Sequence, residues 1–113
     1  MECLIYLRFW RTRTLGAGNI ILRRNVQLPF FPRVGDNLQF DGGDDGMICE
    51  VNKAHYCVDQ KFAAISCDFP AFLDTYELVD LLPLMLKLGW ELHLTSAEIF
   101  NDRQFAFLKT KKK

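Results

Sequence analysis

The N-terminal part of the chain alternates between apolar and mixed positions. From residue 3 to residue 10 the odd positions are all apolar, whereas the even positions include Tyr6, Arg8 and Trp10. A period of two is typical of a β-strand with one buried face. A similar alternation resumes over Ile20–Phe30, after the glycine-containing segment Leu15–Asn19. The two runs therefore predict a long N-terminal β-hairpin.

The register of this hairpin depends on where its turn lies. A turn centred near Ala17 would place Arg11 opposite Arg23, so that like charges face one another across the two strands. Arg23 and Arg24 interrupt the apolar alternation of the second run, and this step predicts a β-bulge.

Three further strands and their turns are predicted in the centre of the chain. Pro29–Pro32 ends the first ladder because proline cannot donate a backbone hydrogen bond. Glycine and aspartate fill the turn Asp41–Gly46, and Asp59–Lys61 forms a second turn. The strands predicted on either side of these turns are Asn37–Asp41, Met47–Val58 and Phe62–Phe69.

The pattern then changes to that of a helix near residues 74–88. Asp74 and Glu77 have the spacing of a capping box, which satisfies two free backbone N–H groups. The apolar residues that follow form a wide helical face, which predicts that this helix covers the sheet. Pro83 either kinks one helix or lies in the first turn of a second helix capped by Asp80.

The C-terminal part predicts two more strands. Gly89 ends the helix, and Trp90–Leu94 alternates in the manner of a strand. Thr95 and Glu98 have the spacing of a second capping box, and Gln104–Lys109 predicts a last strand. Together the elements predict an α+β fold, in which a mostly antiparallel sheet or partly open small barrel packs against one kinked helix.

Length and composition favour one domain. The chain has 113 residues, half of them hydrophobic, which suffices for a single core. We expect residues 1–108 to form this domain and residues 109–113 to form a frayed basic tail. No apolar run reaches the ~20 residues that a membrane span needs, and the N-terminus has no signal-peptide pattern. A cytoplasmic location is expected.

The candidate chemistry of the chain is sparse. His55 lies two residues from Cys57, and both could face other cysteines across a hairpin, but no C-x-x-C pair supports a zinc site. Neither histidine belongs to a signature of nucleophilic catalysis. We therefore assign no residue to catalysis, a cofactor or a metal. Free thiols buried in strands are the expected state of Cys3, Cys49, Cys57 and Cys67.

Charge is unevenly distributed although the net charge is zero. Residues 1–33 contain six arginines and one acid, whereas residues 34–86 contain ten acids and two lysines. Like charges that face one another on a hairpin are mildly destabilising, so anionic groups are expected to offset them: carboxylates of the same chain, carboxylates of a second protein molecule, or nucleic-acid phosphate. The residues predicted to make this contact are Arg8, Trp10, Arg11, Arg13, Arg23 and Arg24.

Three functional hypotheses follow. The first is a small non-enzymatic binding or regulatory module that contacts protein, a second copy of itself included, through the basic hairpin and an acidic surface. The alternative is a small barrel that binds single-stranded nucleic acid with the hairpin arginines and Trp10, although zero net charge gives no long-range attraction to phosphate. A second alternative is a metal-dependent enzyme around His55 and Cys57. None of the three involves a membrane.

Overall fold

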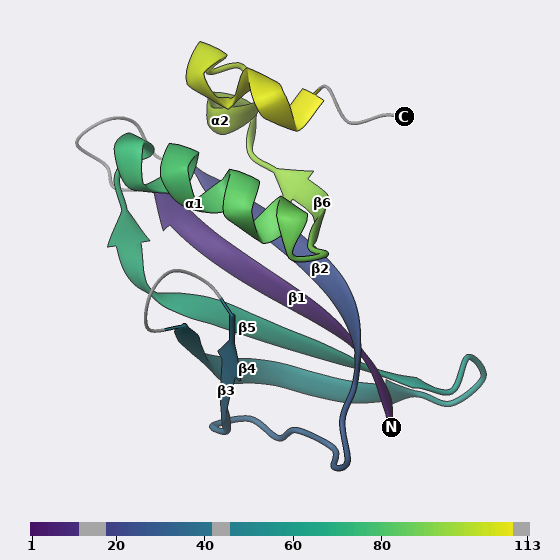
Figure 1. The fold of residues 1–113 in the computed structure, drawn as a ribbon. Helices are drawn as coiled ribbons and strands as arrows, with labels where there is room; N and C mark the ends of the chain where they lie inside the picture. The colour runs from purple at the N-terminus through teal and green to yellow at the C-terminus, as the bar shows by residue number, and fades with distance from the viewer. Residues whose placement is uncertain (12–17, 42–45, 110–113) are drawn as a thin grey trace.

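The computed structural model describes residues 1–11, 18–41 and 46–109. These residues form a six-stranded sheet in the order β3-β4-β5-β1-β2-β6, with the helices gathered on one side of it (Figure 1). The predicted α+β class with a mostly antiparallel sheet is confirmed, and the sheet is open rather than closed into a barrel. The strands are β1 (Glu2–Arg11), β2 (Asn19–Gln27), β3 (Asn37–Phe40), β4 (Met47–Cys57), β5 (Phe62–Leu73) and β6 (Glu91–Thr95).

The predicted N-terminal hairpin is confirmed. β1 pairs with β2 in antiparallel register from Glu2 opposite Gln27 to Trp10 opposite Asn19. Most of the predicted turn, Leu15–Asn19, lies outside the described residues.

The predicted register of the hairpin is wrong. Arg23 lies opposite Tyr6, and the Arg11 N–H donates to the Gly18 carbonyl oxygen over 2.9 Å. The ladder between β1 and β2 is regular, so Arg23 and Arg24 form no bulge there. The structure instead has a shift in the β2–β6 pairing, between Ile21 and Leu22.

β1 is the central strand and its pairing with β5 is parallel, in contrast to every other pair of the sheet. The strands predicted in the centre of the chain are confirmed as β3, β4 and β5, and β5 continues beyond its predicted end to Leu73. A turn at Lys61, whose φ is 61°, joins β4 to β5. Residues 42–45 of the predicted glycine-rich turn lie outside the described part of the chain.

Helix α1 (Thr75–Lys87) begins with the predicted capping box. The Asp74 carboxylate accepts from the Glu77 N–H over 2.8 Å, and the Glu77 carboxylate accepts from the Asp74 N–H over 3.0 Å. The helix continues through Pro83 as a single element, so no second helix begins at Asp80. Gly89, with a φ of 105°, follows its C-terminal end.

The C-terminal segment differs from its prediction. β6 is followed by α2 (Ala97–Phe100), whose N-cap is Ser96 rather than Thr95 and whose cap has no side-chain hydrogen bond. The predicted last strand, Gln104–Lys109, is wrong, because η2 (Arg103–Lys109), made of 3₁₀ turns with a kink at Phe105, occupies this segment. Its buried residues are Phe105, at the kink, and Leu108.

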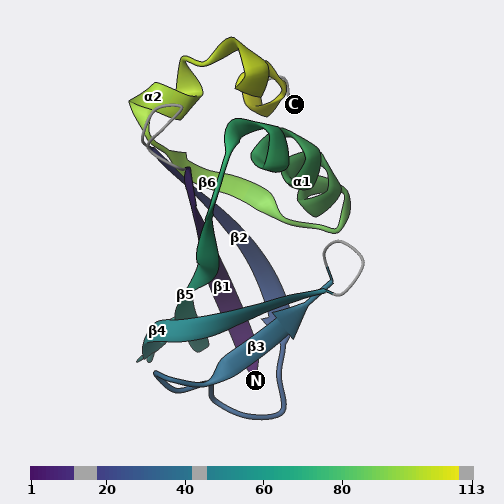
Figure 2. The ribbon, with the colours of Figure 1, turned by 90° about the vertical axis from the view of Figure 1, so that its left-hand side faces the viewer.

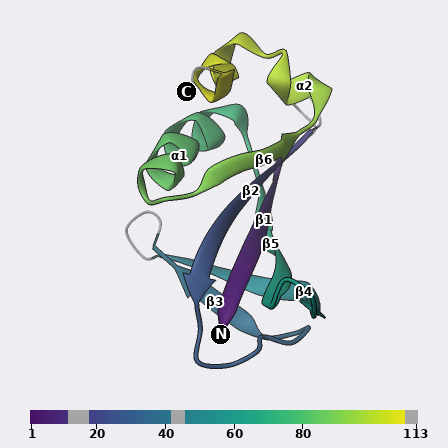
Figure 3. The ribbon, with the colours of Figure 1, turned by 90° about the vertical axis from the view of Figure 1, so that its right-hand side faces the viewer.

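One face of the sheet carries the core. The odd positions of β1 are buried, and α1 contributes Leu78, Leu82 and Met85 to the same core. Figures 2 and 3 show α1, α2 and η2 on this side of β1 and β2, with β3 and β4 curving round below them. We call the opposite side, which none of the described helices covers, the uncovered face. No helix of residues 1–11, 18–41 and 46–109 is long and apolar enough to cross a membrane.

The packing of α1 predicts the cost of shortening its leucines. Leu82→Ala should lower the free energy of unfolding by about 2–5 kcal/mol, the usual cost of emptying a core leucine site. Leu84 is 38% exposed on the same helix and serves as the control, with an expected loss below about 1 kcal/mol for Leu84→Ala. Chemical denaturation measures both. Equal losses at the two positions would contradict the packing of α1 on the sheet.

Candidate functional site

The structure divides the arginines of the predicted basic hairpin between the two faces of the sheet. Arg8 lies on the uncovered face with its guanidinium 5.3 Å from the centre of the Trp10 ring. Arg23 lies on the same face and pairs with Glu91, with 3.5 Å between Nε and Oε1. Arg24 turns to the opposite side, 5.9 Å from the ring of the buried Trp90. The described arginines of the hairpin therefore do not form one basic surface.

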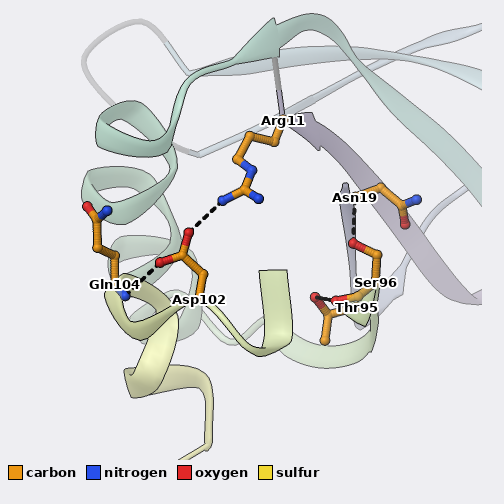
Figure 4. A network of polar contacts seen from close by, with 6 residues as sticks. All are labelled: Arg11, Asn19, Thr95, Ser96, Asp102 and Gln104. Carbon is orange, nitrogen blue, oxygen red and sulfur yellow. Dashed lines mark hydrogen bonds and ion pairs between the residues drawn. The ribbon is translucent and has the colours of Figure 1, made fainter. Parts of the chain in front are cut away.

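Arg11, predicted as a contact residue, is a buried structural residue. Its side chain is 4% exposed and its Nη1 lies 2.8 Å from Oδ2 of Asp102 (Figure 4). The guanidinium also lies 5.7 Å from the centre of the Phe105 ring. Arg11 thus attaches the C-terminal segment to the end of β1. Arg13, the remaining predicted contact residue, lies outside the described residues.

Two groups strengthen this attachment. The Gln104 N–H donates to Asp102 over 3.0 Å, and this bond, followed by that from Arg11, lowers the pKa of Asp102. The Asn19 N–H donates to the Ser96 hydroxyl over 3.1 Å, which joins the same segment to the start of β2. The C-terminal segment is therefore held by charge and hydrogen bonds as well as by its apolar residues.

The uncovered face contains two adjoining hollows. The first has a volume of about 340 Å³, and the second about 470 Å³. Asn52 and Asp68 line both, so the hollows meet at these two residues. The first hollow is further lined by Tyr6, Arg8, Lys53, Ser66 and His93. The second is further lined by Trp10, Val34, Glu50, Pro70 and Phe72.

Aromatic side chains lie at both ends of this paired depression. In the first hollow the rings of Tyr6 and His93 are 4.9 Å apart. In the second, the ring of Trp10 is 6.4 Å from that of Phe72, which is 63% exposed. Exposed aromatic surface next to charged residues is characteristic of binding faces rather than of inert sheet surface.

Charges of both signs lie between the two aromatic ends. The register places Asp68 of β5 beside Arg8 of β1, and Asp68 accepts a hydrogen bond from the Asn52 side chain over 2.5 Å. The charged side chains lining the two hollows make no ion pair within the described part of the chain. These charged residues are Arg8, Lys53, Glu50 and Asp68. Two bases and two acids are thus available to a ligand.

The residues of the metal hypothesis are not brought together. His55 is exposed on β4, opposite Ala64 and near the free end of the β4–β5 hairpin. Cys49 and Cys67 are buried in the core on the other side of the sheet. Among the described residues, no group of three or more His, Cys, Asp and Glu side chains could hold a metal ion.

All four cysteines are free, as predicted. Cys3, Cys49 and Cys67 are buried, whereas Cys57, predicted to be buried, is only half-buried where the hairpin turns. Burial raises the pKa of Cys49 to about 11 and that of Cys67 to about 12, so neither thiol is suited to act as a nucleophile.

Sequence reasoning found Arg8 and Trp10 but missed most of the other residues of the uncovered face. The alternation of β1 places Tyr6 on the same side as Arg8 and Trp10. Asp68, Lys53 and the other residues of β4 and β5 carried no such signal, because they join the site only through the pairing of β5 with β1.

The chain was compared with protein families, curated proteins and solved structures. No protein-family model matches it, and neither a curated protein nor a solved structure shows a significant similarity.

The thiols provide a first test of the site description. We expect Cys57 to react with a thiol reagent in the folded protein, whereas the three buried cysteines should react only after denaturant is added. Cys57→Ser should remove the fast phase of a spectrophotometric thiol titration. A fast phase that remains in this variant would show that the core thiols are accessible, contrary to their burial.

The attachment through Asp102 provides a second test. Because its pKa is lower in the folded than in the unfolded chain, ionised Asp102 stabilises the fold above the unfolded pKa of about 4. This stabilisation is lost as the pH falls through the lower, folded pKa. We therefore expect Asp102→Asn to be less stable than the wild type at neutral pH, with a difference that shrinks below about pH 4. Denaturation at several pH values measures it, and a pH-independent difference would contradict the ion pair with Arg11.

Proposed function

We propose that the protein is a non-enzymatic binding module whose uncovered face binds a protein partner. The observation that carries this proposal is the pair of adjoining hollows, which join exposed aromatic surface to unpaired charges of both signs. Protein interfaces are enriched in aromatic residues and arginine near their centre. Trp10, Arg8 and Tyr6 occupy that position on the middle strand.

Mixed charge favours protein over nucleic acid. The aromatic rings of Tyr6 and Trp10 could stack on bases, as the nucleic-acid alternative requires. The carboxylates of Asp68 and Glu50, however, line the same hollows and would repel phosphate groups. A protein surface carries acids and bases together and can satisfy both.

Site-specific photo-crosslinking in cells tests the proposal. A benzophenone amino acid in place of Phe72 puts the probe in the second hollow at a side chain that is already exposed and aromatic. We expect covalent protein adducts from this position. The same probe in place of Leu84, on α1 and away from the uncovered face, is the control and should give few adducts.

A second variant tests whether the adducts depend on the uncovered face. Trp10→Ala removes the central aromatic residue and should reduce the adduct yield by about tenfold or more, as expected for an interface hot spot. Equal yields from the probes at Phe72 and Leu84 would contradict the proposal. Adducts that are sensitive to nuclease would support the nucleic-acid alternative instead.

A further inference from the structure

We infer that the partner of the uncovered face is a second copy of this chain, packed face to face about a two-fold axis; this inference rests on the proposed function. The axis lies in front of the uncovered face, parallel to the strands and midway between β1 and β5. Rotation about it lays β1 of one copy over β5 of the other, and β5 over β1, as an isologous contact requires.

The register of β1 and β5 supplies the argument. Residues that lie side by side in one copy face one another across such an axis. Tyr6 is in register with Ser66, Arg8 with Asp68, and Trp10 with Phe72. Each of these register pairs is complementary: a phenol with a hydroxyl group, a guanidinium with a carboxylate, and two aromatic rings. All three therefore become favourable contacts between the copies, and each forms twice.

Charge balance also favours a second copy. Arg8 and Asp68 are neighbours but form no ion pair with each other in the described chain. In the dimer Arg8 of each copy meets Asp68 of the other, and both charges are neutralised. The unpaired acids and bases lining the hollows are equal in number, so two identical faces carry no net charge that would repel them. The same rotation brings Lys53 of one copy over Arg23 of the other, and Arg23 already pairs with Glu91 of its own chain.

The geometry of the sheet is compatible with this arrangement. Two sheets that pack face to face keep their strands within about 30° of each other. When two sheets cross at an angle, contacts far from the crossing point move apart the most. Arg8 and Asp68 lie between the Tyr6 and Trp10 positions along the strands, so the contacts between Arg8 and Asp68 move apart the least. A stable interface takes about 800 Å² from each partner, roughly a tenth of the 6981 Å² that one chain exposes.

Complementary charge variants of the full chain provide the test. Arg8→Asp puts two carboxylates at the centre of the face, and Asp68→Arg puts two guanidinium groups there. We expect wild-type protein to sediment at twice the chain mass of 13.1 kDa, and each variant alone to dissociate at least tenfold more readily. An equimolar mixture of the two variants should restore the dimer, because every Arg8–Asp68 contact between the copies again joins opposite charges.

Matched controls separate this effect from a general change of charge. Lys87→Asp and Asp80→Arg make the same changes of charge at exposed positions of α1 and should leave the sedimentation unchanged. Phe72→Asp should also weaken the dimer. Because Phe72 is exposed, this variant should keep its fold and therefore provides a test even if Asp68→Arg does not fold. Thermal unfolding checks that each variant retains its fold.

The outcomes distinguish this inference from the proposed function. A wild-type chain that stays monomeric at all concentrations, or folded variants that do not recover the dimer when mixed, overturns the second copy as partner. If the probe at Phe72 then gives an adduct of a different mass, the uncovered face still binds protein and only the identity of the partner is wrong. If it gives no adduct, the proposed function fails as well.

Discussion

The strand β1 holds the structure together because it is hydrogen-bonded on both edges and buried on one face. β2 and β5 pair with its two edges, and α1 covers its odd-numbered side chains. Because successive side chains of a strand point to opposite faces, the even-numbered side chains of β1 project from the opposite face. The core and the uncovered face are therefore formed by the two sides of the same ten-residue strand.

Local patterns in the sequence were enough to predict most of the elements. Alternation identified β1, β2 and β4, and the spacing of Asp74 and Glu77 located the start of α1. The parallel pairing of β5 with β1 had no local signal, because it depends on which edge of the hairpin remains free. The segment after Asp102 was misread for a different reason. Phe105 and Phe107 alternate as in a strand, but the residues that reach the core are Phe105 and Leu108.

Charge was more difficult to interpret than hydrophobicity. The arginines cluster in the sequence, yet the position of each along its strand decides which face it joins, and Arg11 shares the odd positions of the core while Arg8 does not. Acids from the other end of the chain then neutralise two of them, Asp102 at Arg11 and Glu91 at Arg23. The arginines that cluster in the sequence therefore do not form one basic surface among the described residues. Only the register of the sheet determined which charges remain unpaired.

The contact between Arg11 and Asp102 joins residues 91 positions apart, and this separation has a consequence for the order of synthesis. β1 and β2 precede β5 and Asp102 in the chain, so they are synthesised before the strand that will pair with the second edge of β1 and before the carboxylate that Arg11 contacts. Neither is present until most of the chain has been translated. Until then the edge of β1 that β5 will occupy is open to pairing with a wrong strand, a risk that non-local strand pairing carries.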